Sequence, residues 1–299
     1  MPITLPPISR RSFLATTVAA GTALSVRTVF ADAQSEGANR FALMADTHVA
    51  ADRKFVARGV NVAEHFKTAT EQVLALDEPP AGVLVAGDCA YKSGEAGDYA
   101  TLVELVAPYG KAGVPVHFAL GNHDHREHFW KVMPPEEGQN KLVEGKHLTI
   151  VESPRAKFFL LDSLNKTDVT PGLLGESQRA WLAEQLKRHA DKPAIVVVHH
   201  NPDTRPKTSG LTDTAALMDV LKPAKHVKAL VYGHTHNWAV REEDGLHLIN
   251  LPPVAYVFNK TRPSGWVDMR LEEDGALLKL HSLDAKHAEH GKGVELTWR

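Results

Sequence analysis

The chain has 299 residues, of which 43% are hydrophobic and 23% are charged, a composition that excludes a disordered, collagen-like or coiled-coil chain. The formal net charge of −2 gives no reason to expect a nucleic-acid polymer or a membrane surface as a partner. The single cysteine excludes an intramolecular disulfide framework and a zinc site built from a cysteine cluster.

The N-terminal segment has the features of an export signal. The pair Arg10-Arg11 precedes a mild apolar run over residues 13–26, which is too short to span a bilayer that needs about 20 residues. Small residues at Ala31 and Ala33 follow at the spacing of a cleavage site. A frayed N-terminal helix is the alternative, but the order of charge, apolar run and cleavage site favours a twin-arginine signal peptide.

This interpretation sets the expected domain boundaries and location. We expect the signal peptide to occupy residues 1–33 and a single domain to occupy residues 34–299. We expect the twin-arginine export machinery to be a partner and the mature protein to be periplasmic or secreted. No later apolar run reaches membrane length, so we expect no stable membrane anchor.

The first part of the mature chain alternates between short apolar runs and helical patterns. Runs of four to five apolar residues favour strands buried on both faces, and they lie at 41–45, 83–86, 116–120, 158–161, 195–198 and 229–232. Apolar residues at helical spacing predict helices over 62–76, 99–109 and 176–189. Strands that alternate with helices indicate βαβ units and a mostly parallel sheet.

The pattern changes after Trp238. Four further strands are expected at 246–250, 254–258, 266–271 and 276–282, with Asp-Gly or Pro turns between them. The end of the chain is therefore expected to be an antiparallel patch that completes a second sheet. We find no internal repeat and no linker that would divide the mature chain.

Residue types that bind metals follow five of the six early strands. Each motif alone is weak, because Asp-x-His is common by chance and most Gly-Asp pairs form turns. In open α/β sheets, however, ligands bind beyond the carboxyl ends of the strands, so five such motifs in order are expected to converge. The motifs contain Asp46 and His48; Asp88; Asn122, His123 and Asp124; His199; and His234 and His236.

Over residues 46–236 the chain contains five motifs in this order: Asp-x-His, Gly-Asp, Gly-Asn-His-Asp, His and Gly-His-x-His. Together they resemble the motifs of the calcineurin-like metallophosphoesterases. Gly172-Leu-Leu-Gly175, Gln178 and Trp181-Leu182 look like the branch that contains class III cyclic-nucleotide phosphodiesterases and glycerophosphodiesterases. The resemblance implies an α/β fold, a four-layer α/β/β/α sandwich of two mixed sheets flanked by helices.

The resemblance also implies a dinuclear metal centre. The first metal would be held by Asp46, His48, Asp88 and His236, and the second by Asp88, Asn122, His199 and His234. Nitrogen ligands mixed with carboxylate or amide oxygens suit two transition-metal ions, Fe, Mn, Zn or Co. In such enzymes a hydroxide that bridges the two metals attacks a small phosphoester.

The resemblance assigns catalytic roles to two more residues. His123 would protonate the leaving oxygen, and Asp124 would hold its imidazole in place. His200 is either a substrate contact or an ordinary loop histidine. Tyr91 matches the Gly-Asp-x-x-Tyr of purple acid phosphatases, whose tyrosine binds ferric iron, but His48 takes that coordination place here. We therefore expect Tyr91 to pack beside the site.

The favoured function is a metal-dependent phosphoesterase that hydrolyses a phosphodiester. A phosphomonoesterase of acid-phosphatase type is the alternative enzyme, and an exported protein that binds metal or phosphate without turnover is the alternative of another class. The full ligand set and the presence of His123 favour an enzyme. The loops at 125–147 and 200–211 are expected to contact the substrate.

Overall fold

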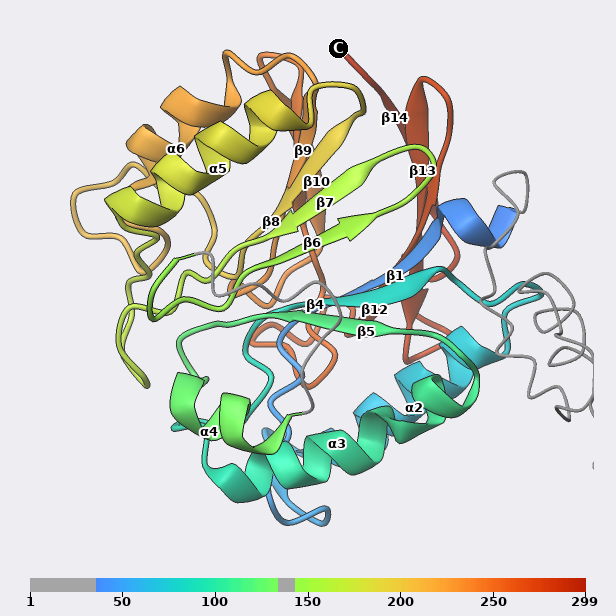
Figure 1. Ribbon diagram of the computed structural model, residues 1–299. Coiled ribbons are helices and arrows are strands. Elements are labelled where there is room, and N and C mark those ends of the chain that lie inside the picture. Colours follow the sequence, from blue (N-terminus) through green and yellow to red (C-terminus); the bar gives the residue numbers. More distant parts are fainter. Residues whose placement is uncertain (1–35, 134–142) are drawn as a thin grey trace, which may run out of the picture. The chain divides into compact units, whose positions relative to one another are not determined.

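The computed structural model describes residues 36–133 and 143–299. The predicted signal peptide at 1–33 lies outside these residues. Two six-stranded sheets stack face to face, and helices cover both outer faces (Figure 1). The predicted four-layer α/β/β/α sandwich is therefore confirmed.

The first sheet is mixed and has the strand order β14-β13-β12-β1-β4-β5. Strands β1, β4 and β5 run parallel, whereas β12 pairs with β1 in the antiparallel sense. The strands are β1 (Arg40–Met44), β4 (Gly82–Ala86), β5 (Val116–Ala119), β12 (Gly265–Leu271), β13 (Gly275–Ser282) and β14 (Gly293–Thr297).

The second sheet is also mixed and has the order β10-β11-β9-β8-β7-β6. Its four central strands are parallel and its two edge strands are antiparallel to them. The strands are β6 (Thr149–Glu152), β7 (Lys157–Leu160), β8 (Ala194–Val197), β9 (Val227–Tyr232), β10 (Ala239–Glu243) and β11 (Leu246–Asn250).

The helices cover the outer faces of the sheets. Helices α2, α3 and α4 lie on the first sheet, and α5 and α6 lie on the second (Figure 1). A 3₁₀ turn (η1, Glu36–Asn39) precedes β1, and a small hairpin of β2 (Val56–Ala57) and β3 (Val60–Asn61) leads into α2. The helices are α2 (Val62–Leu74), α3 (Ala96–Lys111), α4 (Arg126–Val132), α5 (Glu176–Arg188) and α6 (Thr214–Leu221).

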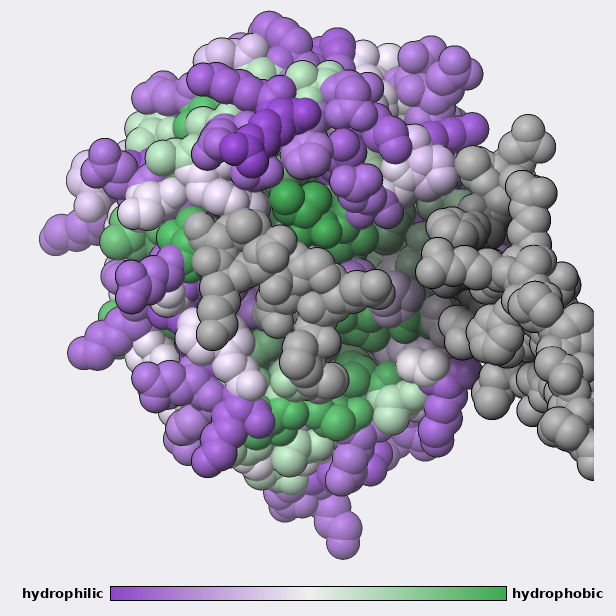
Figure 2. Space-filling view, in the orientation of Figure 1, coloured by the Kyte–Doolittle hydropathy of each residue, from purple (hydrophilic) through white to green (hydrophobic). Residues whose placement is uncertain are grey.

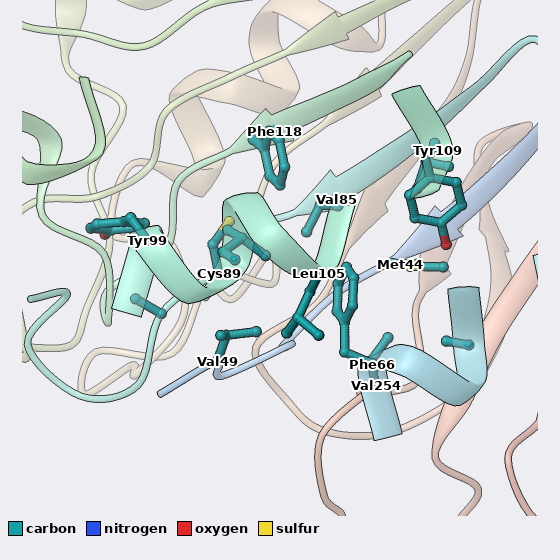
Figure 3. Packing of buried hydrophobic residues seen from close by; sticks show 14 of the residues in the cluster. Met44, Val49, Phe66, Val85, Cys89, Tyr99, Leu105, Tyr109, Phe118 and Val254 are labelled. Atoms are coloured by element: carbon teal, nitrogen blue, oxygen red, sulfur yellow. The ribbon is translucent and has the colours of Figure 1, made fainter. Parts of the chain in front are cut away.

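Alternation along the strands produces the separate layers of core, because successive side chains of a strand point to opposite faces. In β1, Phe41 and Leu43 pack between the two sheets, whereas Met44 packs outward under the helices. Figure 3 shows Phe66 of α2 and Val85 of β4 within this outer core. Burying each such side chain contributes about 1.5–3 kcal/mol. All five residues of β1 are buried, as expected for a central strand.

A buried ion pair fixes the start of the first sheet. The Arg40 guanidinium donates two hydrogen bonds, of 2.9 and 2.8 Å, to the carboxylate of Asp268 in β12, which lies 228 positions later in the chain. Both side chains are buried. Removing one partner of such a pair leaves an uncompensated charge, at a cost of about 3–5 kcal/mol.

The C-terminal strands were predicted to complete the second sheet, but most of them belong to the first. Strands β10 and β11 join the second sheet, but β12, β13 and β14 complete the first sheet through pairing of β12 with β1. The reason is that β1 has only β4 on its other side, and its free edge is filled by the last part of the chain.

The predicted strand over 254–258 was also wrong. Its backbone forms no ladder, and instead the N–H groups of Val254 and Ala255 donate to the carbonyls of Ala45 and Asp46. Val254, Ala255 and Tyr256 are buried, which explains why the segment has the composition of a strand, whereas Phe258 is exposed.

The polarity of the surface differs between the helical layers and the region between them. On the face shown in Figure 2, hydrophilic residues predominate over the two helical layers, and hydrophobic residues gather between them. Within the described part of the chain, none of the helices has both the length and the apolar content required to cross a membrane.

Candidate metal centre

The turns that follow five parallel strands bring the predicted residues together at one edge of the two sheets. Asp46 and His48 follow β1, Asp88 follows β4, and Asn122 and His123 follow β5. On the second sheet, His199 follows β8, and His234 and His236 follow β9. The carboxyl ends of parallel strands point the same way, so both sheets supply side chains to one site.

The first group contains Asp46, His48 and His236, all of them buried. The Nε2 atoms of His48 and His236 lie 3.0 Å apart. Nε2 of His236 is 3.4 Å from Oδ1 of Asp46, and Nε2 of His48 is 4.0 Å from the same oxygen. One carboxylate oxygen and two imidazole nitrogens thus face a common point.

The second group contains Asp88, His199 and His234, and their ligand atoms also lie within 4.8 Å of one another. Nε2 of His199 is 3.2 Å from Oδ1 of Asp88. The other carboxylate oxygen of Asp88, Oδ2, is 3.9 Å from Nε2 of His48 in the first group. Asp88 therefore lies between the two groups.

Hydrogen bonds on the far side of two imidazoles fix which nitrogen faces each group. Nδ1 of His199 lies 2.8 Å from the Ala86 carbonyl, and Nδ1 of His236 lies 2.6 Å from the Tyr256 carbonyl. A carbonyl only accepts, so each Nδ1 carries the proton, and in the neutral ring each Nε2 presents a lone pair to the group.

The same region contains buried polar atoms without a hydrogen-bond partner. These include Nε2 of His199 and Oδ1 of Asn122. Burying such atoms unpaired is costly unless something else binds them. Nitrogen and oxygen lone pairs facing common points are the donor set of a transition-metal site, so the residues present fit two metal ions.

The electrostatics support the same conclusion. Burial acts to raise the pKa of Asp88, but the charge of His199 and its hydrogen bond to this carboxylate outweigh burial and hold this pKa well below its usual range. Burial lowers the pKa of His48 to about 3 and that of His234 to about 4, so both rings are neutral. Burial also opposes protonation of His199, yet Asp88 raises its pKa to about 9. The two carboxylates attract positive charge, which a bound cation would supply.

Five of these side chains sit on left-handed backbone. The φ angles are between 44° and 68° at Asp46, His48, Asp88, His234 and His236. This conformation costs about 1–2 kcal/mol for a residue that carries a Cβ. Strain of this kind is typical of sites where the position of a side chain matters more than local stability.

Glycine is required at one of these turns. A Cβ on Gly121 would overlap the carboxylate of Asp88 and the ring of His199. Only glycine allows the backbone to approach these side chains so closely. The Gly before Asn122 thus brings the turn after β5 into the site.

Comparison with known proteins is consistent with this geometry. The sequence model of the family described as Calcineurin-like phosphoesterase matches residues 39–238.

The chain belongs to this family.

Relatives and a solved structure agree with the assignment. The 3′,5′-cyclic adenosine monophosphate phosphodiesterase CpdA of Haemophilus influenzae is 28% identical over 246 residues, which cover 78% of this chain and 85% of the relative. A probable cyclic nucleotide phosphodiesterase of Synechococcus is 28% identical over 240 residues, 75% and 85% of the two chains. A dimetal phosphatase from Danio rerio shares the fold, with a TM-score of 0.66, 16% identity and coverage of 88% of this chain and 100% of that one.

His123 lies at the edge of the phosphoesterase site. Its side chain is 27% exposed, its backbone N–H donates to Oδ1 of Asp88 at 2.9 Å, and its Nδ1 lies 2.8 Å from the Lys92 carbonyl. Nδ1 therefore carries a proton, and Nε2 is the nitrogen left for other contacts.

Asp124 does not have the position that we expected. Its carboxylate accepts from the backbone N–H groups of Cys89, Ala90 and Gly121, and from the Tyr99 hydroxyl at 3.2 Å. Burial, followed by the charge of Asp88, raises its pKa to about 6. Asp124 thus holds the turns after β4 and β5 together.

A cavity of about 420 Å³ opens above the two groups. Tyr256 and Phe258 line one part of it, and Asn201 and Arg205, from the expected loop at 200–211, line another. Among the residues that the structure describes, the lining consists of His48, Asp88, Asn122, His123, Thr170, Asn201, Arg205, Ser209, His234, Thr235, His236, Tyr256 and Phe258. From the expected loop at 125–147, none of the described residues is in this lining.

The aromatic part of the cavity was not predicted from the sequence, because residues 254–258 have the composition of a strand. Tyr256 stacks on His48 with ring centroids 5.1 Å apart, and Phe258 stacks on His236 at 4.2 Å. The Pro252-Pro253 pair just before this segment was the available signal, since proline disfavours a central strand.

Two residues whose roles were open now have clear positions. Tyr91 packs against Phe55, with ring centroids 4.5 Å apart, beside the site as expected. His200 is fully buried, is 2.7 Å from the Ser163 hydroxyl through Nδ1, and packs against the ring of His234 at 4.7 Å. His200 is therefore neither an ordinary loop histidine nor part of the cavity lining.

Proposed function

We propose that this phosphoesterase is a dinuclear metal enzyme that hydrolyses a phosphodiester, with a 3′,5′-cyclic nucleotide as the favoured substrate. The observation that carries the proposal is the pair of adjacent ligand groups with Asp88 between them, next to the cavity. The names of the relatives from Haemophilus influenzae and Synechococcus support the choice of substrate.

The ligand assignment follows the two groups. Asp46, His48, Asp88 and His236 would hold one ion, and Asp88, Asn122, His199 and His234 the other. Asn122 joins the second set because its buried Oδ1 has no partner. The imidazole and oxygen donors suit Fe, Mn, Zn or Co.

When bound, two such ions polarise the phosphoryl group and lower the pKa of the attacking water. Side chains of the protein bind and orient the substrate and supply the proton for the leaving group. The aromatic side chains of Tyr256 and Phe258 and the polar side chains of Asn201 and Arg205 bind and orient the substrate in the cavity. In its imidazolium form His123 transfers the Nε2 proton to the leaving alkoxide and becomes a neutral ring, which keeps the Nδ1 proton hydrogen-bonded to the Lys92 carbonyl.

The test is a substrate panel with metal-reconstituted protein. The panel contains cyclic nucleotides, glycerophosphodiesters, nucleoside monophosphates and aryl phosphates, and Asp88→Ala is the inactive control. We expect the highest kcat/KM for a 3′,5′-cyclic nucleotide. Faster turnover of monoesters would establish a phosphomonoesterase instead, and no turnover of any phosphoester would contradict an enzymatic function.

We also propose that the protein is exported by the twin-arginine pathway and acts in the periplasm or outside the cell. The sequence features that support this are Arg10-Arg11, the apolar run and the Ala31-Asp32-Ala33 site. The conservative double substitution Arg10→Lys with Arg11→Lys is expected to leave uncleaved precursor inside the cell. Normal export of this variant would contradict the twin-arginine pathway.

A further inference from the structure

A turn between β7 and α5 packs against the turn that carries His123. The backbone N–H of Asp168 donates to the carbonyl of Asn122 at 2.6 Å, and the hydroxyl of Thr167 donates to the carbonyl of Asp124 at 2.8 Å. These bonds fix the residues on both sides of His123 to a segment more than 40 positions away in the chain.

The carboxylate of Asp168 points toward the His123 imidazole. Its Oδ1 lies 3.3 Å from Nδ1 of His123, which also lies 2.8 Å from the Lys92 carbonyl. The one Nδ1 proton thus lies between two oxygens from two different segments. This arrangement fixes the tautomer and the rotation of the ring, so that Nε2 is presented to the cavity that His123 lines.

Among the described residues, Asp168 is the one whose carboxylate lies within 4 Å of a nitrogen of this imidazole. Asp124, which is adjacent to His123 in sequence, is occupied by three backbone N–H groups and the Tyr99 hydroxyl.

The backbone at Asp168 adopts a conformation that is unfavourable for most residues. Its φ is 57°, in the left-handed region, and a bridge between Lys166 and Val169 closes the turn around it. Aspartate, asparagine and glycine tolerate this conformation better than other residues do. Thr170, two positions later, lines the cavity itself, so the turn lies next to the substrate.

We propose that Asp168 is the positioning residue of the proton donor His123. The proposal rests on the proposed function, because it assigns a partner to the residue that protonates the leaving oxygen. Asp168 does not line the cavity, and it acts by holding the His123 ring in the orientation that protonates the substrate.

The test uses two variants that keep the turn. Asp168→Asn removes the charge and Asp168→Gly removes the side chain, and both residues tolerate a positive φ. Asp244→Asn is the matched control, since Asp244 is also exposed, has a φ of 54° and is paired with Lys222 at 2.9 Å in a hairpin turn that is not part of the cavity lining.

For 3′,5′-cyclic AMP, which expels an alkoxide, both Asp168 variants are expected to lower kcat by on the order of 10-fold with KM unchanged. For bis-p-nitrophenyl phosphate, whose leaving group needs no proton, kcat is expected to stay within about 2-fold. Metal content and the thermal unfolding midpoint should match those of Asp244→Asn.

Three results would overturn the proposal. They are equal slowing of both substrates, wild-type kinetics on both, and loss of metal or of thermal stability in both variants beyond that of the control. A reconstituted wild-type protein that hydrolyses neither substrate would overturn the proposed function, and this inference with it.

Discussion

The two sheets contribute different chemistry to the site. The turns of the first sheet supply both carboxylates, the amide and the imidazole of His48. The turns of the second sheet supply imidazoles alone, those of His199, His234 and His236. Each ligand group takes members from both sheets. Neither sheet therefore contains a metal site by itself, and the centre forms only when the sheets are stacked.

Direct hydrogen bonds also cross from one sheet to the other at this point. Nδ1 of His199 donates to the Ala86 carbonyl at the end of β4, and the N–H of His234 donates to Oδ2 of Asp46 at 3.0 Å. Away from the site an apolar cluster fills the space between the sheets, and side-chain hydrogen bonds from Arg155 to the Leu271 carbonyl and between His247 and the Thr297 carbonyl also join them. The site thus replaces part of the hydrophobic interface between the sheets with polar bonds. Metal binding is expected to strengthen the association of the two sheets.

The largest effect is expected from the residue between the two groups. Asp88→Ala should lose both metals and reduce kcat/KM by on the order of 10³-fold, because one carboxylate serves both ions. His199→Ala, on the second sheet, should lose mainly one. Elemental analysis with Asp52→Ala as an exposed control tests this, and retention of two ions by Asp88→Ala would contradict the shared position.

The next effect concerns His123, which is not a ligand and lies on the turn after β5 of the first sheet, next to the turn after β7 of the second. His123→Ala should keep both metals and slow hydrolysis of a diester with an alkoxide leaving group by about 10²-fold, since a positioned proton donor contributes about 10²–10⁴-fold. Slowing should be much smaller with a nitrophenolate leaving group. Loss of metal, or equal slowing with both substrates, would assign His123 a structural role.

Removing the metals should weaken the interface between the sheets. A ligand at 100 times its Kd stabilises a protein by about 2.7 kcal/mol, which corresponds to roughly 5–10 °C in Tm for a domain near this size. Calorimetry of the chelated and reloaded protein measures the shift. Asp88→Ala should show almost none, and a similar shift in this variant would mean that metal binds elsewhere.

The smallest effect is expected at a residue beside the site on the first sheet. Tyr91→Phe should change kcat by less than about 2-fold, because its ring packs against Phe55 and the phenylalanine ring keeps this contact. The wild-type protein loaded with ferric iron should show no tyrosinate charge-transfer band. Such a band, lost in Tyr91→Phe, would establish coordination by Tyr91.

The fold and the residues of the two ligand groups could largely be anticipated because their signals are local. Alternating apolar runs predict buried strands, and a residue directly after a parallel strand has to lie at one edge of the sheet. Asp88 and His199 could be grouped in this way although they lie on different sheets.

The features that were missed depend on partners far away in the chain. Nothing in the sequence of β12 specifies that it pairs with β1, and so the C-terminal strands were assigned to the wrong sheet. Adjacency in sequence was also misleading. Asp124 follows His123, but its carboxylate accepts hydrogen bonds from the backbone of Cys89 and Gly121. Asp168 carries no motif, and only the packing of its turn brings it to His123.

The bond between Arg40 and Asp268 has a consequence for the timing of biosynthesis. The strand that begins the domain has a neighbour 228 positions later, and synthesis at about 5–20 residues per second takes roughly 10–50 s to produce it. During this interval the edge of β1 that later pairs with β12 has no native partner, and the buried arginine can pair with Asp77 but not yet with Asp268. Folding of the first sheet is therefore a late event, completed only when almost the entire polypeptide has left the ribosome.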